Sequence, residues 1–159
     1  MRHAEAISAA QHLTQVFPHD NFGWKALGTL YKQIGQTTEA LRPLQKAAEL
    51  SPNDAEIFNK LGITYQDLGQ IDEAEKSCRQ ALQIKSDFAE AFNTLGIILN
   101  EQGRYKEAVT SYQQALHVQP NYASALTDQS NTLDDLGQIN DAEKNCRHAI
   151  EVDPNYAPA

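Results

Sequence analysis

The 159-residue sequence lacks a long apolar run, and this absence excludes a membrane-spanning protein. No apolar stretch approaches the roughly 20 residues that a transmembrane helix needs, so we expect no membrane partner. The N-terminal stretch MRHAEAISAAQHL carries Glu5 and has no continuous apolar core, which makes it a poor signal peptide. The sequence therefore predicts a cytoplasmic protein.

Basic residues are also in short supply, with 13 Lys and Arg against 21 Asp and Glu. Residues 21–54 carry four basic and three acidic residues, whereas residues 123–156 carry two basic and seven acidic residues. A surface that follows a phosphate backbone needs a basic stripe, so nucleic acid is not an expected partner. The acidic end has a simpler alternative explanation, because surface charge aids solubility.

What the sequence does contain is a repeat of 34 residues. An aromatic or large apolar residue recurs near the start of each unit, at Trp24, Phe58, Phe92 and Leu126. A constant period of this length is typical of a helix pair that is stacked several times. The sequence therefore predicts an all-α solenoid of antiparallel helix pairs.

The repeat divides the chain into six segments. Residues 1–20 match the second half of a unit, and residues 3–16 are expected to form its helix. Four complete units follow, and residues 157–159 begin another. The complete units are predicted at 21–54, 55–88, 89–122 and 123–156.

Small residues predict where the paired helices touch. Gly28, Gly62 and Gly96 share one position inside the first helix, where glycine costs ~1 kcal/mol relative to alanine. Close approach of the second helix would offset this cost. In the fourth unit Gln129-Ser130 replaces the usual Leu-Gly pair, so we expect that first helix to pack less well.

Turn and capping residues predict the helix ends. In the first complete unit, Gly35 is expected to end one helix in a left-handed conformation, and a second helix is expected at about 38–50. Asp54 is expected to cap the next helix. Asp72 and Asp87 each precede a glutamate by three residues, the spacing of a capping box. Pro43 falls inside a predicted helix, where proline costs ~3 kcal/mol or bends the helix.

The residues that usually carry catalysis or bind metals show no useful spacing. The five histidines fit neither a metal site nor a catalytic triad, and no glycine-rich phosphate loop is present. Cys78 and Cys146 share a repeat position with Leu44 and Tyr112, so we expect buried apolar residues rather than a disulfide. The sequence predicts no enzyme activity, no catalytic residue, no metal and no cofactor.

The repeated residues resemble the tetratricopeptide repeat, whose pattern is Trp-x2-Leu-Gly-x2-Tyr followed by Ala, an aromatic residue, Ala and Pro. The resemblance covers four units and the leading half unit. It implies a right-handed superhelix whose first helices line a concave groove that commonly binds peptides. More loosely, FPHDNFGWKALGTLYKQIG and NDAEIFNKLG resemble arrays that precede bacterial glycosyltransferase domains of the O-linked N-acetylglucosamine transferase type.

Carried onto this chain, the resemblance places a partner-binding groove on the first helices. Asn59 and Asn93 share a repeat position, and their amides could pair with an extended peptide backbone or could simply be solvated. The groove grades from lysines to aspartates, which favours a dipolar peptide with its basic end toward the fourth unit. The expected groove residues are Lys25, Thr29, Lys32, Asn59, Lys60, Ile63, Gln66, Asn93, Thr94, Ile97, Asn100, Thr127, Asp128, Asn131, Asp134 and Asp135.

Three hypotheses for function follow. The first is a non-catalytic scaffold that binds a peptide or protein segment in the groove. The second is the substrate-recruiting arm of a larger bacterial glycosyltransferase-type enzyme. The third is self-association through uncapped repeat ends, where the apolar residues of the last unit would meet water or another copy. Those apolar residues are Leu126, Leu133, Ala142, Cys146, Ala149 and Val152.

Overall fold

The computed structural model describes residues 2–153, and all regular structure in this range is helical. The chain divides into unit 1, which ends at Ile84, and unit 2, which begins at Lys85. Within residues 2–153, unit 1 holds five helices and unit 2 holds four. The helices are α1 (Arg2–Val16), α2 (Asn21–Gln33), α3 (Thr37–Leu50), α4 (Ala55–Asp67), α5 (Ile71–Ile84), α6 (Ala89–Glu101), α7 (Tyr105–Val118), α8 (Ala123–Asp135) and α9 (Ile139–Val152).

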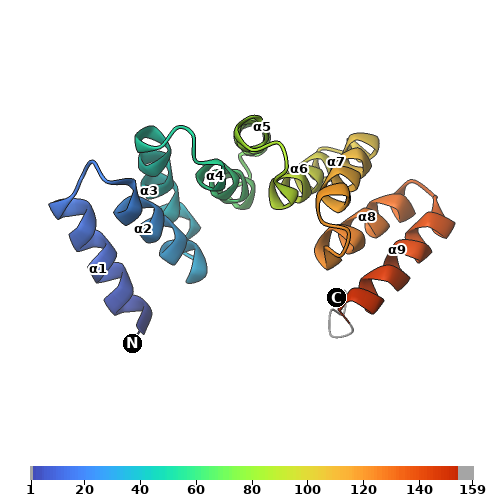
Figure 1. Cartoon of the computed structure of the whole chain (residues 1–159), viewed down its shortest axis with the longest axis horizontal. Coiled ribbons are helices and arrows are strands. Elements are labelled where there is room, and N and C mark those ends of the chain that lie inside the picture. Colours follow the sequence, from blue (N-terminus) through green and yellow to red (C-terminus); the bar gives the residue numbers. More distant parts are fainter. Residues whose placement is uncertain (1, 154–159) are drawn as a thin grey trace. The chain divides into compact units, whose positions relative to one another are not determined.

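In unit 1, each helix packs against the next one in the chain (Figure 1). The amide nitrogen Nε2 of Gln11 donates to the Tyr31 hydroxyl at 3.0 Å. One repeat later, Nε2 of Gln45 donates to the Tyr65 hydroxyl at the same distance of 3.0 Å. Helix α1 therefore packs on α2 in the way that α3 packs on α4.

In unit 2, α6 pairs with α7 and α8 pairs with α9, while α7 and α6 both contact α8. The expected all-α solenoid of helix pairs is therefore confirmed. None of the helices within residues 2–153 is long and apolar enough to cross a membrane. The predicted start of another repeat at 157–159 lies outside the described residues.

A glycine with a left-handed backbone ends the first helix of each pair. Gly35, Gly69, Gly103 and Gly137 have φ angles of 75°, 72°, 73° and 72°. The amide of Gly35 donates to the carbonyl of Lys32 at 3.0 Å, which closes the helix end. Because glycine adopts this conformation without strain, the chain reverses and the second helix returns along the first.

The glycine inside the first helix lets the second helix come close. A Cβ atom at Gly28 would lie 2.6 Å from Cγ of Leu44 and 3.3 Å from the carbonyl oxygen of Ala40. The predicted close approach is confirmed, and one large side chain of the second helix fills the space. The corresponding pairs are Gly62 with Cys78 and Gly96 with Tyr112.

The two cysteines are free, and each contacts the first helix of its pair. Cys78 is buried, and burial raises the pKa of its thiol to about 12. Cys146 is half-buried, with its sulfur 2.9 Å from the hydroxyl of Ser130. Cys78 therefore packs as the sequence predicts, whereas Cys146 also takes part in a polar contact.

The fourth pair uses hydrogen bonds where the others use a glycine contact. The Ser130 hydroxyl donates to the carbonyl of Ala142 at 2.7 Å, and Ser130 is 2% exposed. The Asn145 amide donates to Oε1 of Gln129 at 2.8 Å. The substitution at Gln129-Ser130 therefore makes this helix contact polar, and the side chains occupy the space between α8 and α9.

The helix starts are only partly as predicted. Asp54 caps α4, because its carboxylate accepts from the amides of Glu56 at 3.0 Å and Ile57 at 3.4 Å. The predicted capping boxes at Asp72 and Asp87 are both wrong. Helix α5 already begins at Ile71, which places Asp72 inside it, and α6 begins two residues after Asp87. A shift of one or two residues at each boundary removes the acid from the capping position.

Pro43 lies inside α3, and the helix continues past it to Leu50. Proline at this position removes the backbone hydrogen bond to the fourth residue before it. The Pro43 ring is buried, and burial of its apolar surface offsets part of that loss.

The sequence predicts that the apolar residues of the fourth repeat, at 123–156, are exposed. This prediction is wrong for most of them. Leu126 and Leu133 on α8 are 2% and 5% exposed, and Ala142 and Ala149 on α9 are also buried. These residues are covered because α8 and α9 pack on each other. The large apolar residues that α9 does expose are Ile139 and Ile150.

We predict that Gly62→Leu lowers the free energy of unfolding by about 1–3 kcal/mol, because the new side chain collides with Cys78 in a packed contact. The measurement is urea unfolding followed by circular dichroism. Gln83→Leu is the matched control, since Gln83 is exposed on α5. Equal stability of the two variants would contradict the packing role of Gly62.

Candidate partner-binding groove

The first helices of unit 1 border a cleft at the predicted place. The cleft has a volume of ≈ 330 Å³ and combines apolar with polar lining residues. Four of the six lining residues belong to the predicted groove, and the fully buried Leu44 of α3 lies behind them. The lining residues are Thr29, Lys32, Gln33, Leu44, Lys60 and Ile63.

Two of the predicted groove lysines are paired within unit 1. Nζ of Lys25 lies 2.9 Å from the Asp54 carboxylate and 2.8 Å from the Glu56 carboxylate. Burial alone would lower the pKa of Lys25, but the hydrogen bonds to these acids raise it above its ordinary value. Lys32 pairs with the carboxylate of Asp67 on α4, although burial lowers the pKa of Lys32.

These ion pairs change the expected charge of the groove. Lys25 and Lys32 are paired with acids of the chain, so the predicted basic end of the groove carries less net positive charge than the sequence suggests. Lys60 forms no ion pair within the described part of the chain. Lys60 is therefore the lysine of this surface that is available to a partner.

The other predicted groove residues of unit 1 differ in burial. The Thr29 hydroxyl donates to the Lys25 carbonyl at 2.8 Å, so it is engaged within its own helix. Gln66 is half-buried. Asn59 is buried, and its Oδ1 accepts no hydrogen bond from the described residues. Because Asn59 and Asn93 belong to different units, their predicted alignment on one face stays a prediction.

In unit 2, a polar cluster joins α6 to α8. The Asn93 amide donates to Oδ2 of Asp128 at 3.1 Å and contacts the Ser124 hydroxyl at 3.5 Å. The Ser124 hydroxyl donates to the same carboxylate oxygen at 3.3 Å. No basic side chain of the described residues pairs with Asp128. Burial raises the pKa of Asp128, and the hydrogen bonds from Asn93 and Ser124 lower it by less.

The remaining predicted residues of unit 2 surround this cluster on α6 and α8. Thr94 and Thr127 are buried, and the Thr94 hydroxyl donates to the Glu90 carbonyl at 2.9 Å. Ile97 and Asn100 are half-buried, and Oδ1 of Asn100 has no hydrogen-bond partner within residues 2–153. The fully exposed members of the set are Asn131, Asp134 and Asp135.

Sequence reasoning missed the acids that neutralise the lysines. Lys25 is 31 residues from Glu56, and Lys32 is 35 residues from Asp67. In unit 2, Asn93 lies 31 residues from Ser124 and 35 from Asp128. These separations are close to one repeat, so a search for polar pairs 31 or 35 residues apart would have found them.

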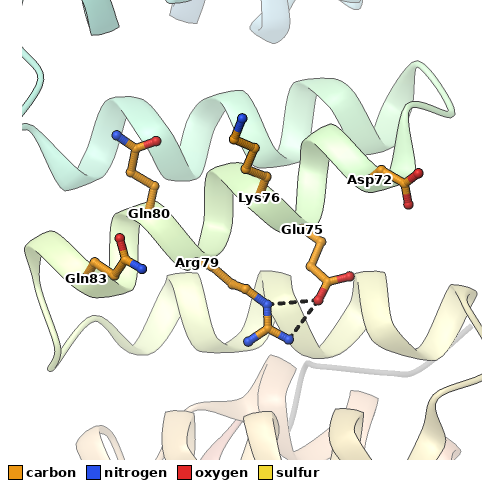
Figure 2. Close-up of a pocket in the computed structure, with 6 residues that line it drawn as sticks. All are labelled: Asp72, Glu75, Lys76, Arg79, Gln80 and Gln83. Atoms are coloured by element: carbon orange, nitrogen blue, oxygen red, sulfur yellow. Dashed lines mark hydrogen bonds and ion pairs between the residues drawn. The ribbon is translucent and has the colours of Figure 1, made fainter.

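A second surface, on α5, does not indicate a particular ligand. Figure 2 shows a charged face of α5, where Arg79 and Glu75 pair at 2.7 Å and the neighbouring side chains point outward. The residues drawn there mix acidic, basic and amide groups, so no single ligand chemistry is indicated. Within residues 2–153, no three His, Cys, Asp or Glu side chains are grouped in a way that could hold a metal ion.

Comparison with known protein families agrees with this arrangement of helix pairs. A family model described as "Cytochrome c-type biogenesis protein H TPR domain" matches residues 10–125, and one described as "Tetratricopeptide repeat" matches residues 123–156. The chain belongs to the tetratricopeptide-repeat family. No curated protein matches the sequence of this tetratricopeptide-repeat chain.

Solved tetratricopeptide-repeat structures share the fold. A crystal structure of MamA matches with a TM-score of 0.84 at 22% sequence identity. The match covers 93% of this chain and 86% of the MamA chain. A MamA structure from Desulfovibrio magneticus RS-1 matches with a TM-score of 0.85 at 14% sequence identity. This match covers 98% of this chain and 88% of the MamA chain. A structure described as "YrrB: a TPR protein with an unusual peptide-binding site" has a TM-score of 0.78 at 19% identity, covering 98% and 80%.

We predict that Asp128→Asn raises the thermal unfolding midpoint at pH 7. Because folding raises the pKa of Asp128, the ionised carboxylate weakens the folded state at neutral pH, and stability returns as the pH falls. The difference from the wild type should shrink as the pH approaches 3.8, the ordinary pKa of this side chain. Asp134→Asn, at an exposed position of α8, is the control. A lower midpoint for Asp128→Asn at pH 7 would contradict this account.

Proposed function

We propose that this tetratricopeptide-repeat chain is a non-catalytic scaffold that holds a peptide or protein segment against the first helices of its repeats. The observation that carries the proposal is the cleft of ≈ 330 Å³ in unit 1. Clefts of this size that combine apolar walls with a few polar groups are typical ligand sites. The partner is therefore recognised by its side chains as well as by its backbone.

The lining of the cleft defines the kind of segment that fits. Ile63, which is half-buried, offers apolar contact to one large side chain of the partner. Lys60 offers a cation that the described residues do not neutralise. A peptide with an apolar residue next to a carboxylate, from an acidic side chain or a C-terminus, matches both features.

The comparisons support this class of partner without naming it. YrrB is described as a tetratricopeptide-repeat protein with a peptide-binding site, and its fold covers 98% of this chain. The predicted role as the recruiting arm of an enzyme uses the same groove, and it stays a prediction from the sequence.

Self-association is a second candidate that a different observation favours. Ile139 and Ile150 on α9 are 57% and 55% exposed, which is unusual for isoleucine. Exposed apolar residues on a repeat helix can pack against a second copy. Light scattering that returns the mass of a monomer at high protein concentration would remove this candidate.

We predict that Ile63→Arg abolishes binding of most peptides selected from a displayed random library against the wild-type chain. The arginine would fill the cleft and place a second cation beside Lys60. Isothermal titration of selected peptides measures the loss, which we expect to be at least about tenfold, or 1.4 kcal/mol.

Gln83→Arg is the matched control for Ile63→Arg, because it adds the same side chain to an exposed position on α5. Circular dichroism of both variants shows whether they are folded. If the selected peptides bind Ile63→Arg as tightly as they bind the control, the cleft is not the binding site.

A further inference from the structure

We propose that the α6–α8 surface of unit 2 binds a basic peptide segment whose two cationic side chains pair with the carboxylates of Asp128 and Asp135. The inference rests on the proposed function and names the partner chemistry for unit 2. Four observations carry it: the repeat positions shared with unit 1, the cluster at Asp128, the amide of Asn100, and the lack of an internal cation.

The two units place different residues at the same two repeat positions. In unit 1, Lys25 and Lys32 of α2 reach acids at the start and end of α4. One period is 34 residues, so the residues two periods later on α6 are Asn93 and Asn100. Asparagine carries no charge, and the positive member of each ion pair is therefore missing from unit 2.

At the first position, the acids of unit 1 are replaced, because Asp54 and Glu56 correspond to Tyr122 and Ser124. The carboxylate beside Asn93 is that of Asp128, which corresponds to Lys60 and is half-buried. Asp128 receives hydrogen bonds from Asn93 and Ser124 through one carboxylate oxygen, Oδ2. Its charge has no cation within the described residues. Asn93 is 5% exposed, and its Oδ1 has no hydrogen-bond donor. A half-buried carboxylate that is hydrogen-bonded only by neutral groups suits an added ammonium or guanidinium group.

At the second position, the acid of unit 1 is retained. Asp67, the partner of Lys32, corresponds two periods later to Asp135 at the end of α8. Asn100 stands at the position of the lysine, and its Oδ1 is buried without a donor. At the second position, the acid is therefore kept while an amide replaces the lysine.

The described part of unit 2 offers no cation of its own on the two helices that form this surface. Helices α6 and α8 contain five acidic residues and no lysine, arginine or histidine. Three of the basic residues of unit 2 pair with acids on or beside their own second helices. These pairs are Arg104 with Glu107, Lys144 with Asp141, and Arg147 with Glu143.

The spacing of the two positions defines the peptide. Asn93 and Asn100 are seven residues apart on one helix, which is about 10.5 Å at 1.5 Å per residue. Three residues of an extended chain span about 10 Å. A segment with lysine or arginine at two positions three residues apart therefore reaches both. A metal ion is not the matching ligand, because no three suitable side chains are grouped in the described part of unit 2.

The test uses a synthetic hexapeptide, acetylated and amidated, with lysines at its second and fifth positions and alanines elsewhere. Binding to the full chain is measured by isothermal titration at about 50 mM salt, where exposed charges are weakly screened. The same peptide with norleucine in place of lysine is the neutral control. We expect binding of the lysine peptide and at least tenfold weaker binding of the norleucine peptide.

Two variants test the site itself. Asn93→Lys with Asn100→Lys supplies the missing cations from within the chain, as in unit 1, and should weaken lysine-peptide binding at least tenfold. Asp128→Asn should also weaken it while the chain stays folded. The matched control is Gln113→Lys with Gln114→Lys, which adds the same charge at exposed positions of α7 and should leave most of the affinity intact.

Two outcomes would overturn the inference. One is equal binding of the lysine and norleucine peptides to the wild type. The other is an equal loss of affinity in the α6 variant and in the α7 control, which would show general attraction to an acidic protein. If the lysine peptide fails while library peptides still depend on Ile63, the proposed function stands and only this inference falls.

Discussion

The structure depends on one contact, in which a small residue of each first helix makes room for a side chain of the second. Gly28 accepts Leu44 at this contact, and the fourth pair uses the hydroxyl of Ser130 in the same place. Glycine weakens an isolated helix by ~1 kcal/mol. Burial of a leucine contributes about 1.5–3 kcal/mol, so the paired state is favoured overall. Each first helix is thereby held by its inner face, and the groove residues are left on another face.

This division lets the groove residues vary while the fold stays the same. Lys25 and Asn93 share a repeat position and sit on similarly packed helices, yet one forms two ion pairs and the other donates to Asp128. Neither residue contributes to the glycine contact. The packing positions therefore define the helix pair, whereas the polar residues on the first helices give each unit its own binding chemistry.

The fold could be read from the sequence because its determinants are local and repeated. Gly35 recurs at every turn, and its backbone conformation follows from the lack of a side chain. The capping residues were less predictable. Asp54 and Asp87 look alike in the sequence, but α6 starts too late for Asp87 to reach a free backbone amide. A shift of one residue in the start of the helix decides whether the aspartate can cap it. The local sequence composition does not reveal that shift.

The sequence predicts several residues that line the cleft of unit 1, but it does not predict which of their charges are paired. Periodicity placed Lys32 and Ile63 on the first helices, and both line the cleft. The neutralisation of Lys32 depends on Asp67, which comes 35 residues later and meets it only after two helices have packed. The exposure of apolar residues in the last repeat was equally hard to predict from the sequence. Apolar composition marks Leu126 and Ile139 equally, and only the packed structure shows that the first is buried and the second exposed.

The central claim is that partners bind the first helices, and a nuclear magnetic resonance titration tests it most directly. The backbone amide signals of the isotope-labelled chain would be followed as the two-lysine hexapeptide is added. The account predicts that shifts concentrate on α6 and α8, with the largest near Asn93 and Asp128. Shifts confined to the outer faces of α7 and α9 would contradict it, whereas an unchanged spectrum would contradict only the basic-peptide site of unit 2.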